Sequence, residues 1–161
     1  MFYLKDCYRR IIRNPNPNNL CLFFKVMALT RRLKILDSER CVGCQSCMFA
    51  CTRREGKASL NGSRIKVKSI GGMERGFTVI VCRACFDPSC MYVCPVSALE
   101  KRPAGGVKLH KEKCLGCGKC LEACPLSAIS MDEEERKPLI CLYCGYCKNY
   151  CAYGVLDIEK V

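Results

Sequence analysis

Cysteine is far more abundant in this chain than in most proteins, with 18 cysteines among 161 residues. Sixteen of them form four groups, each within a run of eleven to thirteen residues. These groups, numbered quartets one to four, are Cys41, Cys44, Cys47 and Cys51; Cys82, Cys85, Cys90 and Cys94; Cys114, Cys117, Cys120 and Cys124; and Cys141, Cys144, Cys147 and Cys151. Three have the spacing C-x2-C-x2-C-x3-C, which is typical of [4Fe–4S] ligands, and quartet two has four residues in its middle gap. The sequence predicts four [4Fe–4S] clusters as the only cofactors.

The spacing has a physical reason. Three thiolates two residues apart let a tight loop wrap one face of a cluster, while the fourth points toward a neighbouring cluster. Glycines between the ligands permit unusual backbone angles and let amide N–H groups approach the sulfurs; they are Gly43, Gly116, Gly118 and Gly145. Pro95 and Pro125 follow the last cysteine of quartets two and three, and we expect a helical turn to begin there.

Two other uses of cysteine compete with this interpretation. A disulfide scaffold predicts scattered spacings and a signal peptide, and the sequence shows neither. Structural zinc usually takes two C-x2-C pairs separated by a longer loop, often with histidine among the ligands. The only histidine is His110, and the cysteines are crowded into short runs. Iron–sulfur clusters are favoured, and zinc is the alternative.

The formal net charge of +12 would suggest nucleic acid or an anionic surface as a partner in an ordinary protein. Each oxidised cluster with its four thiolates carries about −2, so four clusters leave a modest positive surplus. We expect no nucleic-acid partner. The simplest interpretation of this surplus is a weakly positive, solvated surface, and the functional alternative is a docking face for an acidic partner.

No stretch approaches the eighteen uninterrupted apolar residues of a membrane span. The run LTRRLKIL, from Leu29 to Leu36, contains the arginine pair of an export signal, but charged residues beginning at Asp37 follow the run at once where such a signal needs an apolar region. With sixteen thiolates to keep reduced, the chain is expected in the cytoplasm. Residues 1–26 are an N-terminal extension in which Cys7 and Cys21 are expected to be free thiols, and Met27 is a candidate for the true start.

Between the quartets, short apolar runs predict β-strands. The pattern indicates strands at 33–36 and 155–158, and a pair formed by 64–69 and 77–81. The repeat C-P-x-S-A-[LI] after quartets two and three predicts two further hairpins, 98–101 with 107–110 and 128–131 with 138–140. With 161 residues the chain is too short for a large apolar core beside the clusters, so the clusters must supply much of it.

The run CRACFDPSCMYVCPVSAL, from Cys82 to Leu99, resembles the second quartet of four-cluster ferredoxin-like subunits that serve molybdenum and tungsten oxidoreductases and some hydrogenases. The resemblance covers residues 33–158. Quartet four lacks the long insertion of the commonest branch, and CLYCGYCKNYCAYGVLDI is similar to small iron–sulfur subunits of the aldehyde ferredoxin oxidoreductase family, including tungsten-dependent benzoyl-CoA reductase complexes. Ala152 stands where that family often has proline, which puts only the local turn in doubt.

The resemblance implies an α+β fold of two bacterial-ferredoxin-like halves, made of short helices and β-hairpins around the four clusters. The shared Cys-Pro pattern pairs quartet two with three, in a half at 82–124, and quartet one with four, in a half at 27–81 and 125–161. A sequential pairing, one with two and three with four, is the alternative.

The implied function is electron transfer, in which the chain relays single electrons to or from a large catalytic oxidoreductase subunit. The favoured partner is a tungsten aldehyde-oxidoreductase-type enzyme, with a ferredoxin or a flavin subunit as a further partner. The alternative is a free-standing polyferredoxin or the iron–sulfur subunit of a hydrogenase or molybdopterin enzyme. The chain itself is not expected to be an enzyme.

Other polar and aromatic residues are given structural roles. His110 is expected to be a solvated residue on a hairpin strand, and the acidic turn 132–135 to be solvated too. Four tyrosines surround quartet four and are expected to pack against its cluster and exclude water; they are Tyr143, Tyr146, Tyr150 and Tyr153.

Removing one predicted ligand should damage both the cofactor content and the fold. Cys117→Ser should lose one cluster and loosen the part of the chain that contains quartets two and three, because metal binding free energy is also folding free energy in such sites. Iron analysis of the anaerobically purified protein measures the loss. Cys21→Ser is the matched control and should leave the iron content unchanged; a cluster lost in that variant would show that the quartets are wrongly assigned.

Overall fold

In the computed structural model, residues 31–71 and 76–160 are described. The expectations for the extension 1–26, for Cys7 and Cys21 and for a start at Met27 lie outside these residues.

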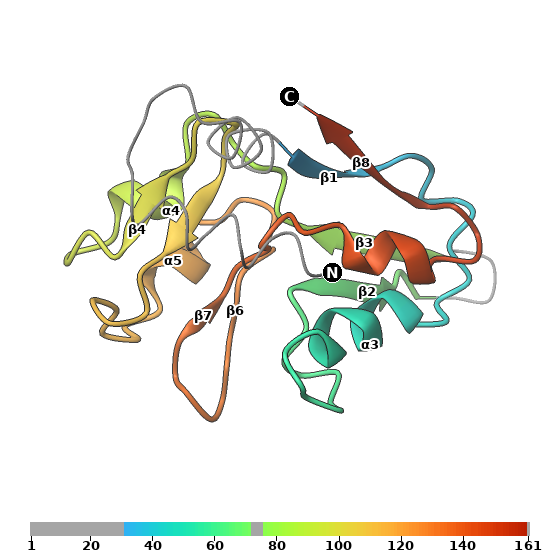
Figure 1. The fold of residues 1–161 in the computed structure, drawn as a ribbon, viewed down its shortest axis with the longest axis horizontal. Coiled ribbons are helices and arrows are strands. Elements are labelled where there is room, and N and C mark those ends of the chain that lie inside the picture. The colour runs from blue at the N-terminus through green and yellow to red at the C-terminus, as the bar shows by residue number, and fades with distance from the viewer. Residues whose placement is uncertain (1–30, 72–75, 161) are drawn as a thin grey trace, which may run out of the picture.

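Four two-stranded antiparallel sheets and a few short helices make up the described chain (Figure 1). The strand pairs are β1 (Arg31–Ile35) with β8 (Leu156–Lys160), β2 (Ile65–Ser69) with β3 (Phe77–Val81), β4 (Leu99–Lys101) with β5 (Val107–Leu109), and β6 (Ser130–Met131) with β7 (Pro138–Leu139). The helices are α3 (Ser46–Arg53), α4 (Ser89–Tyr92), α5 (Lys119–Glu122) and the 3₁₀ helix η1 (Tyr146–Tyr150). The predicted α+β mixture of short helices and hairpins is confirmed, and all three hairpins predicted from the sequence form.

The sheet of β1 and β8 joins the two ends of the described chain. Leu33 lies opposite Ile158 in this pair, and Ile35 lies opposite Leu156. Leu33 and Leu156 are buried because alternate side chains of a strand point to the same face. The chain segments that lead into quartet one and out of quartet four therefore lie side by side, and α3 packs against η1 next to them.

Apolar side chains gather in two separate clusters. The first core contains side chains from β1, β2, β3 and β8 together with two cysteines; its buried members are Leu33, Cys47, Ile65, Val67, Val79, Val81, Cys147, Val155 and Leu156. The second core is smaller and contains Leu99, Val107, Cys120, Ile129 and Ile140. Cysteines of all four quartets lie in these cores or pack against them. The β1–β8, β2–β3 and β4–β5 sheets thus turn apolar side chains toward predicted metal ligands.

One local expectation is wrong. No helical turn follows Pro95 or Pro125; α4 and α5 end two residues before Cys94 and Cys124, and a turn follows each cysteine. The preceding helix ends before the cysteine because a residue that precedes proline avoids the helical region. The turn after the cysteine does not continue as a helix because the third residue after each cysteine has a left-handed backbone. In each turn a serine with a left-handed backbone, Ser97 or Ser127, donates its N–H to the carbonyl of that cysteine.

The expectation of a solvated acidic turn at 132–135 holds for Glu133, Glu134 and Glu135, which are exposed, but is wrong for Asp132. Asp132 is buried, and its Oδ1 accepts the backbone N–H groups of Glu134 and Glu135 at 3.0 and 3.1 Å. Its Oδ2 lies 3.0 Å from Lys57 Nζ, which comes from the loop after α3. The N–H of Glu135 and the Lys57 ammonium hold the pKa of Asp132 below its ordinary value. The turn is therefore an anchor between two distant segments.

Candidate metal centres

Three cavities are each lined by four cysteines, in every case the first three of one quartet and the last of another. We name each site by its first cysteine. The Cys41 site has Cys41, Cys44, Cys47 and Cys151; the Cys141 site has Cys141, Cys144, Cys147 and Cys51; and the Cys114 site has Cys114, Cys117, Cys120 and Cys94. The structure thus brings together cysteines that lie up to 110 residues apart in the chain, Cys41 and Cys151.

The remaining four cysteines, Cys82, Cys85, Cys90 and Cys124, form a fourth group. Burial raises the pKa of Cys90 to about 12, and the nearby charges of Cys82 and Cys124 contribute to the rise. Cys85 is a further neighbour of Cys90. We name this group the Cys82 site. It follows the same rule, since Cys124 is the last cysteine of quartet three.

Helix geometry explains why a quartet is divided between two sites. Cys47 and Cys51 stand four residues apart on α3, so they lie on one face of the helix, one turn apart. The first of them lines the Cys41 site and the second lines the Cys141 site. Quartet four is divided in the same way. Cys147 on η1 lines the Cys141 site, and Cys151, just after η1, lines the Cys41 site.

The loops between the ligands share a backbone pattern. In quartets one, three and four, the second and fourth residues after the first cysteine are left-handed, with φ between +54° and +81°. These residues are Gly43 and Gln45, Gly116 and Gly118, and Tyr143 and Gly145. Alternating right- and left-handed residues direct successive N–H groups into one concavity, which is a nest for an anion and recurs in iron–sulfur sites. The unusual angles predicted for the glycines are confirmed.

Five backbone N–H groups donate to cysteine sulfurs at 3.3 to 3.4 Å; the pairs are Arg64 to Cys51, Ala98 to Cys94, Gly116 to Cys114, Tyr143 to Cys141, and Val155 to Cys151. Hydrogen bonds of this kind stabilise a sulfur that carries negative charge. The described loops are therefore shaped to hold thiolates.

Quartet two departs from this pattern because its middle gap is longer. Ala84 takes the first left-handed position, but no residue between Cys85 and Cys90 has a positive φ. Phe86, inside the gap, has 65% of its surface exposed. Cys90 is only partly buried, whereas the third cysteine of each other quartet is buried.

Burial also sets the protonation of the thiols. It raises the pKa of Cys47 and Cys120 to about 11 and that of Cys147 to about 12, and the charges of neighbouring cysteines add to the effect in each case. These thiols keep their protons at neutral pH unless a bound cation replaces them, and metal binding therefore releases protons.

The residues fit a multi-atom anionic cluster. Among residues 31–71 and 76–160, no three His, Cys, Asp or Glu side chains meet closely enough to hold a single metal ion. The four cysteines of a site stand around a cavity instead, with N–H groups directed at their sulfurs. A cluster bound there would accept and release single electrons.

The tyrosines of quartet four divide into two kinds. Tyr143 is buried, as expected, but its hydroxyl lies 3.0 Å from Sγ of Cys82, which belongs to another quartet. Tyr146, Tyr150 and Tyr153 are at least 36% exposed, so the expectation that they exclude water from the cluster is wrong for them. No sequence signal indicates the contact between Tyr143 and Cys82, because these residues lie 61 positions apart.

His110 is half-buried rather than freely solvated. Its Nε2 lies 2.7 Å from Oε2 of Glu100 on the neighbouring strand of the hairpin. The hydrogen bond lowers the pKa of the Glu100 carboxyl. The pair stabilises the hairpin of β4 and β5 and lies outside the four cysteine sites.

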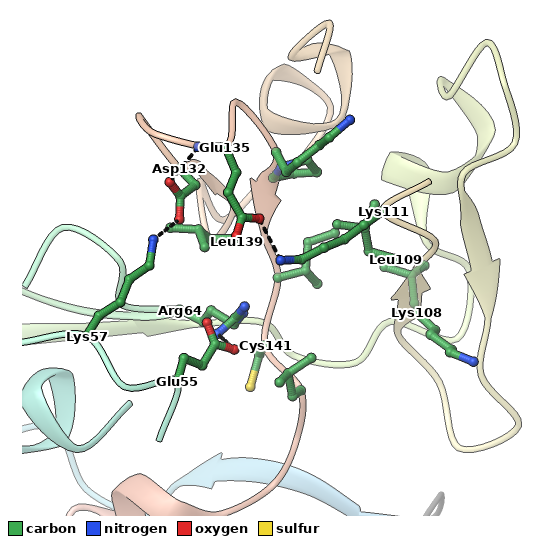
Figure 2. A pocket seen from close by; sticks show the side chains of 15 residues that line it. Glu55, Lys57, Arg64, Lys108, Leu109, Lys111, Asp132, Glu135, Leu139 and Cys141 are labelled. Atoms are coloured by element: carbon green, nitrogen blue, oxygen red, sulfur yellow. Dashed lines mark hydrogen bonds and ion pairs between the residues drawn. The ribbon is translucent and has the colours of Figure 1, made fainter. Parts of the chain in front are cut away.

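A cleft of about 190 Å³ opens beside the Cys141 site. Figure 2 shows the sulfur of Cys141 at its edge, with Lys57 directed toward Asp132 and Lys111 directed toward Glu135. Arg64 and Glu55 form a third ion pair in its wall. Three ion pairs thus join segments that line this cleft.

Comparisons with known proteins agree with this chemistry. Residues 82–136 match the LdpA Fe-S cluster-binding domain family. The chain is 32% identical over 120 residues to a tetrathionate reductase subunit of Salmonella typhimurium, a match that covers 71% of this chain and 48% of that protein. It is 32% identical over 124 residues to a putative dimethyl sulfoxide reductase iron-sulfur subunit of Halobacterium salinarum, with 65% of this chain and 47% of the relative covered.

A third relative is the beta subunit of the NADH-dependent phenylglyoxylate dehydrogenase of Aromatoleum evansii, which is 33% identical over 126 residues. That match covers 74% of this chain and 28% of the relative. The chain spans about half the length of the first two relatives. The names of these proteins are those of oxidoreductase subunits, and they do not point to tungsten enzymes. In the part of the chain that the structure describes, no helix has both the length and the apolar character needed to cross a membrane.

Two glycines of one loop offer a matched test of the ligand geometry. Gly116 and Gly118 are both left-handed, so alanine at either position costs about 1–2 kcal/mol in backbone strain. A Cβ on Gly116 would also lie 2.3 Å from the carbonyl oxygen of Arg136, whereas one on Gly118 would meet nothing closer than 3.9 Å. We expect Gly116→Ala to lower the temperature at which the anaerobic protein loses its visible absorbance by several degrees more than Gly118→Ala does. Equal losses would contradict the close approach of Gly116 to Arg136.

Proposed function

We propose that this chain is an electron-transfer subunit that relays single electrons through four [4Fe–4S] clusters, to or from a catalytic oxidoreductase subunit. The observation that carries the proposal is the exchange of cysteines, in which the last member of each quartet stands at the site of another. Two-cluster bacterial ferredoxins share ligands in this way. The match to an Fe-S cluster-binding domain supports the same chemistry.

The sixteen cysteines are the proposed ligands, four to a site. Their exchange supports two ferredoxin-like halves, one containing the Cys41 and Cys141 sites and the other the Cys82 and Cys114 sites. The first core lies with the first pair and the second core with the second. The hairpin of β6 and β7 goes with the second core, since Ile129 and Ile140 at its two ends are members of that core.

The order of the sites follows from their neighbours. Cys51 and Cys151 connect the Cys41 and Cys141 sites, and Cys94 and Cys124 connect the other two. The charge of Cys82 contributes to the raised pKa of Cys141, after burial, so these two cysteines are close neighbours. We infer a linear relay in which the Cys41 and Cys114 sites are the ends. The chain contributes by holding the ligands, burying the third cysteine of most quartets and directing N–H groups at sulfurs.

Two kinds of partner are candidates. The compact fourth quartet favours the catalytic subunit of a tungsten aldehyde-oxidoreductase-type enzyme. The names of the relatives favour a reductase subunit instead, among them that of dimethyl sulfoxide reductase, with a molybdenum-pterin enzyme as the chemical class proposed. A free-standing polyferredoxin is the third possibility. A cytoplasmic location is proposed because sixteen thiolates need a reducing compartment until the clusters form.

Cofactor analysis tests the first part of the proposal. Protein purified anaerobically should contain about four irons and four acid-labile sulfides for each quartet, and electron paramagnetic resonance of the reduced protein should show [4Fe–4S] signals. Zinc in place of iron, with no sulfide, would contradict the proposal.

The ends of the relay allow a test of the partner. Val42 and Leu115 are exposed side chains between the first two ligands of the Cys41 and Cys114 sites, and a catalytic subunit has to dock near one end of the relay. We expect either Val42→Glu or Leu115→Glu, but not both, to release the large partner that co-purifies anaerobically from native cells, with no change in iron content. Tungsten in that partner supports the favoured class, and molybdenum supports the second. Retention of the partner by both variants would contradict docking at an end.

A further inference from the structure

One side chain connects the two middle sites of the proposed relay. Tyr143 lies between Cys141 and Cys144 in the sequence, and its own N–H donates to the sulfur of Cys141. Its hydroxyl lies 3.0 Å from the sulfur of Cys82. The same residue thus contacts a ligand of the Cys141 site through its backbone and a ligand of the Cys82 site through its side chain.

The backbone conformation at this position makes tyrosine an unusual choice. Tyr143 is left-handed, with φ of +54°, and the equivalent residues in quartets one and three are Gly43 and Gly116. Glycine adopts that conformation without strain, whereas a residue with a Cβ does not. A strained residue persists where its surroundings hold it, and such residues concentrate at functional sites.

The surroundings do hold Tyr143 in place. Only 2% of its surface is exposed, and the guanidinium carbon of Arg102 lies 4.1 Å from the centre of its ring. Gly106 faces the hydroxyl so closely that a Cβ there would lie 2.1 Å from the oxygen. The N–H of Gly106 is bonded to the carbonyl of Cys85 at 2.8 Å, so the wall around the hydroxyl belongs to the Cys82 site itself.

The chemistry of the contact fixes its direction once a metal is bound. A metal-bound cysteine is a thiolate, which can only accept a hydrogen bond, so the tyrosine hydroxyl has to be the donor. A donor at a ligand sulfur stabilises the more negative, reduced state of a cluster and raises its potential. The cation over the ring draws electron density from the phenol and strengthens the donor.

We propose that Tyr143 is a tuning residue between the two halves, whose hydroxyl raises the potential of the cluster at the Cys82 site and so sets how readily electrons cross from the Cys141 site. The inference rests on the proposed function, since it needs clusters at both sites. A purely structural role would be to fill space between the halves. The two roles differ in one respect, because only the tuning role depends on the hydroxyl proton.

The test is Tyr143→Phe, which keeps the ring and removes the donor. In a redox titration followed by electron paramagnetic resonance, one of the four one-electron steps should move to lower potential. We expect the ratio of reduced to oxidised cluster at a fixed potential to fall about tenfold, equivalent to about 59 mV for a one-electron couple. Tyr150→Phe is the matched control. Its hydroxyl is exposed and bonds to that of Tyr146, and it should leave all four steps unchanged.

A second variant keeps the inference testable if the phenylalanine protein fails to assemble. Replacing Tyr143 by a tyrosine fluorinated beside its hydroxyl retains the contact but makes the hydroxyl a stronger donor, so the same step should move to higher potential. Iron and sulfide analysis of every protein separates the two proposals. Absence of clusters from the unmodified protein would overturn the proposed function, whereas four clusters with an unshifted step in either variant would overturn the role of Tyr143 alone.

Discussion

Each cysteine site needs a ligand from a distant part of the chain, and the rest of the structure is arranged to supply it. The last cysteine of quartet four stands at the Cys41 site and that of quartet one at the Cys141 site, so residues 90 to 110 positions apart have to meet. The pairing of β1 with β8 brings these segments together, and the contact of α3 with η1 brings the helices that carry Cys47 and Cys147 side by side. Neither core is large enough to hold such a short chain firmly by apolar burial alone. Metal binding therefore has to contribute much of the free energy of folding.

Placing so many thiolates in one interior has an electrostatic cost, and the backbone carries much of the compensation. Left-handed residues direct N–H groups at the sulfurs, at a cost in strain that is small for glycine and larger for Gln45 and Tyr143. The positive charge from the surplus of Lys and Arg in the sequence also offsets the negative charge of the thiolates. Many of the described cations, such as Lys57 and Lys111, pair with carboxylates instead of approaching cysteines. The local field at the sulfurs thus comes mainly from oriented backbone dipoles, and the net charge acts at longer range.

Sequence reasoning succeeded where local rules decide the structure. The hairpins follow from alternation and turn residues, and the positive φ angles at Gly116 and Gly118 follow from the ligand spacing. It failed at Pro95 and Pro125, where the preference for proline at a helix start predicts a helical turn but a left-handed serine two residues later ends the turn. The burial of Asp132 could not be predicted, because it depends on Lys57, 75 residues away. The contact of Tyr143 with Cys82 is of the same kind, a long-range pairing with no local signal.

The junction between the two cores is polar rather than apolar. Lys66 of β2 donates to the carbonyl oxygens of Ser127 and Ile129, and Lys57 binds Asp132 and Glu134 across the same seam. Ion pairs that remain partly exposed contribute little and weaken with salt. The contact of Tyr143 with Cys82 differs from them because the tyrosine itself is buried and because its partner is a predicted metal ligand. In the proposed relay, this contact lies where electrons would cross between the two middle sites.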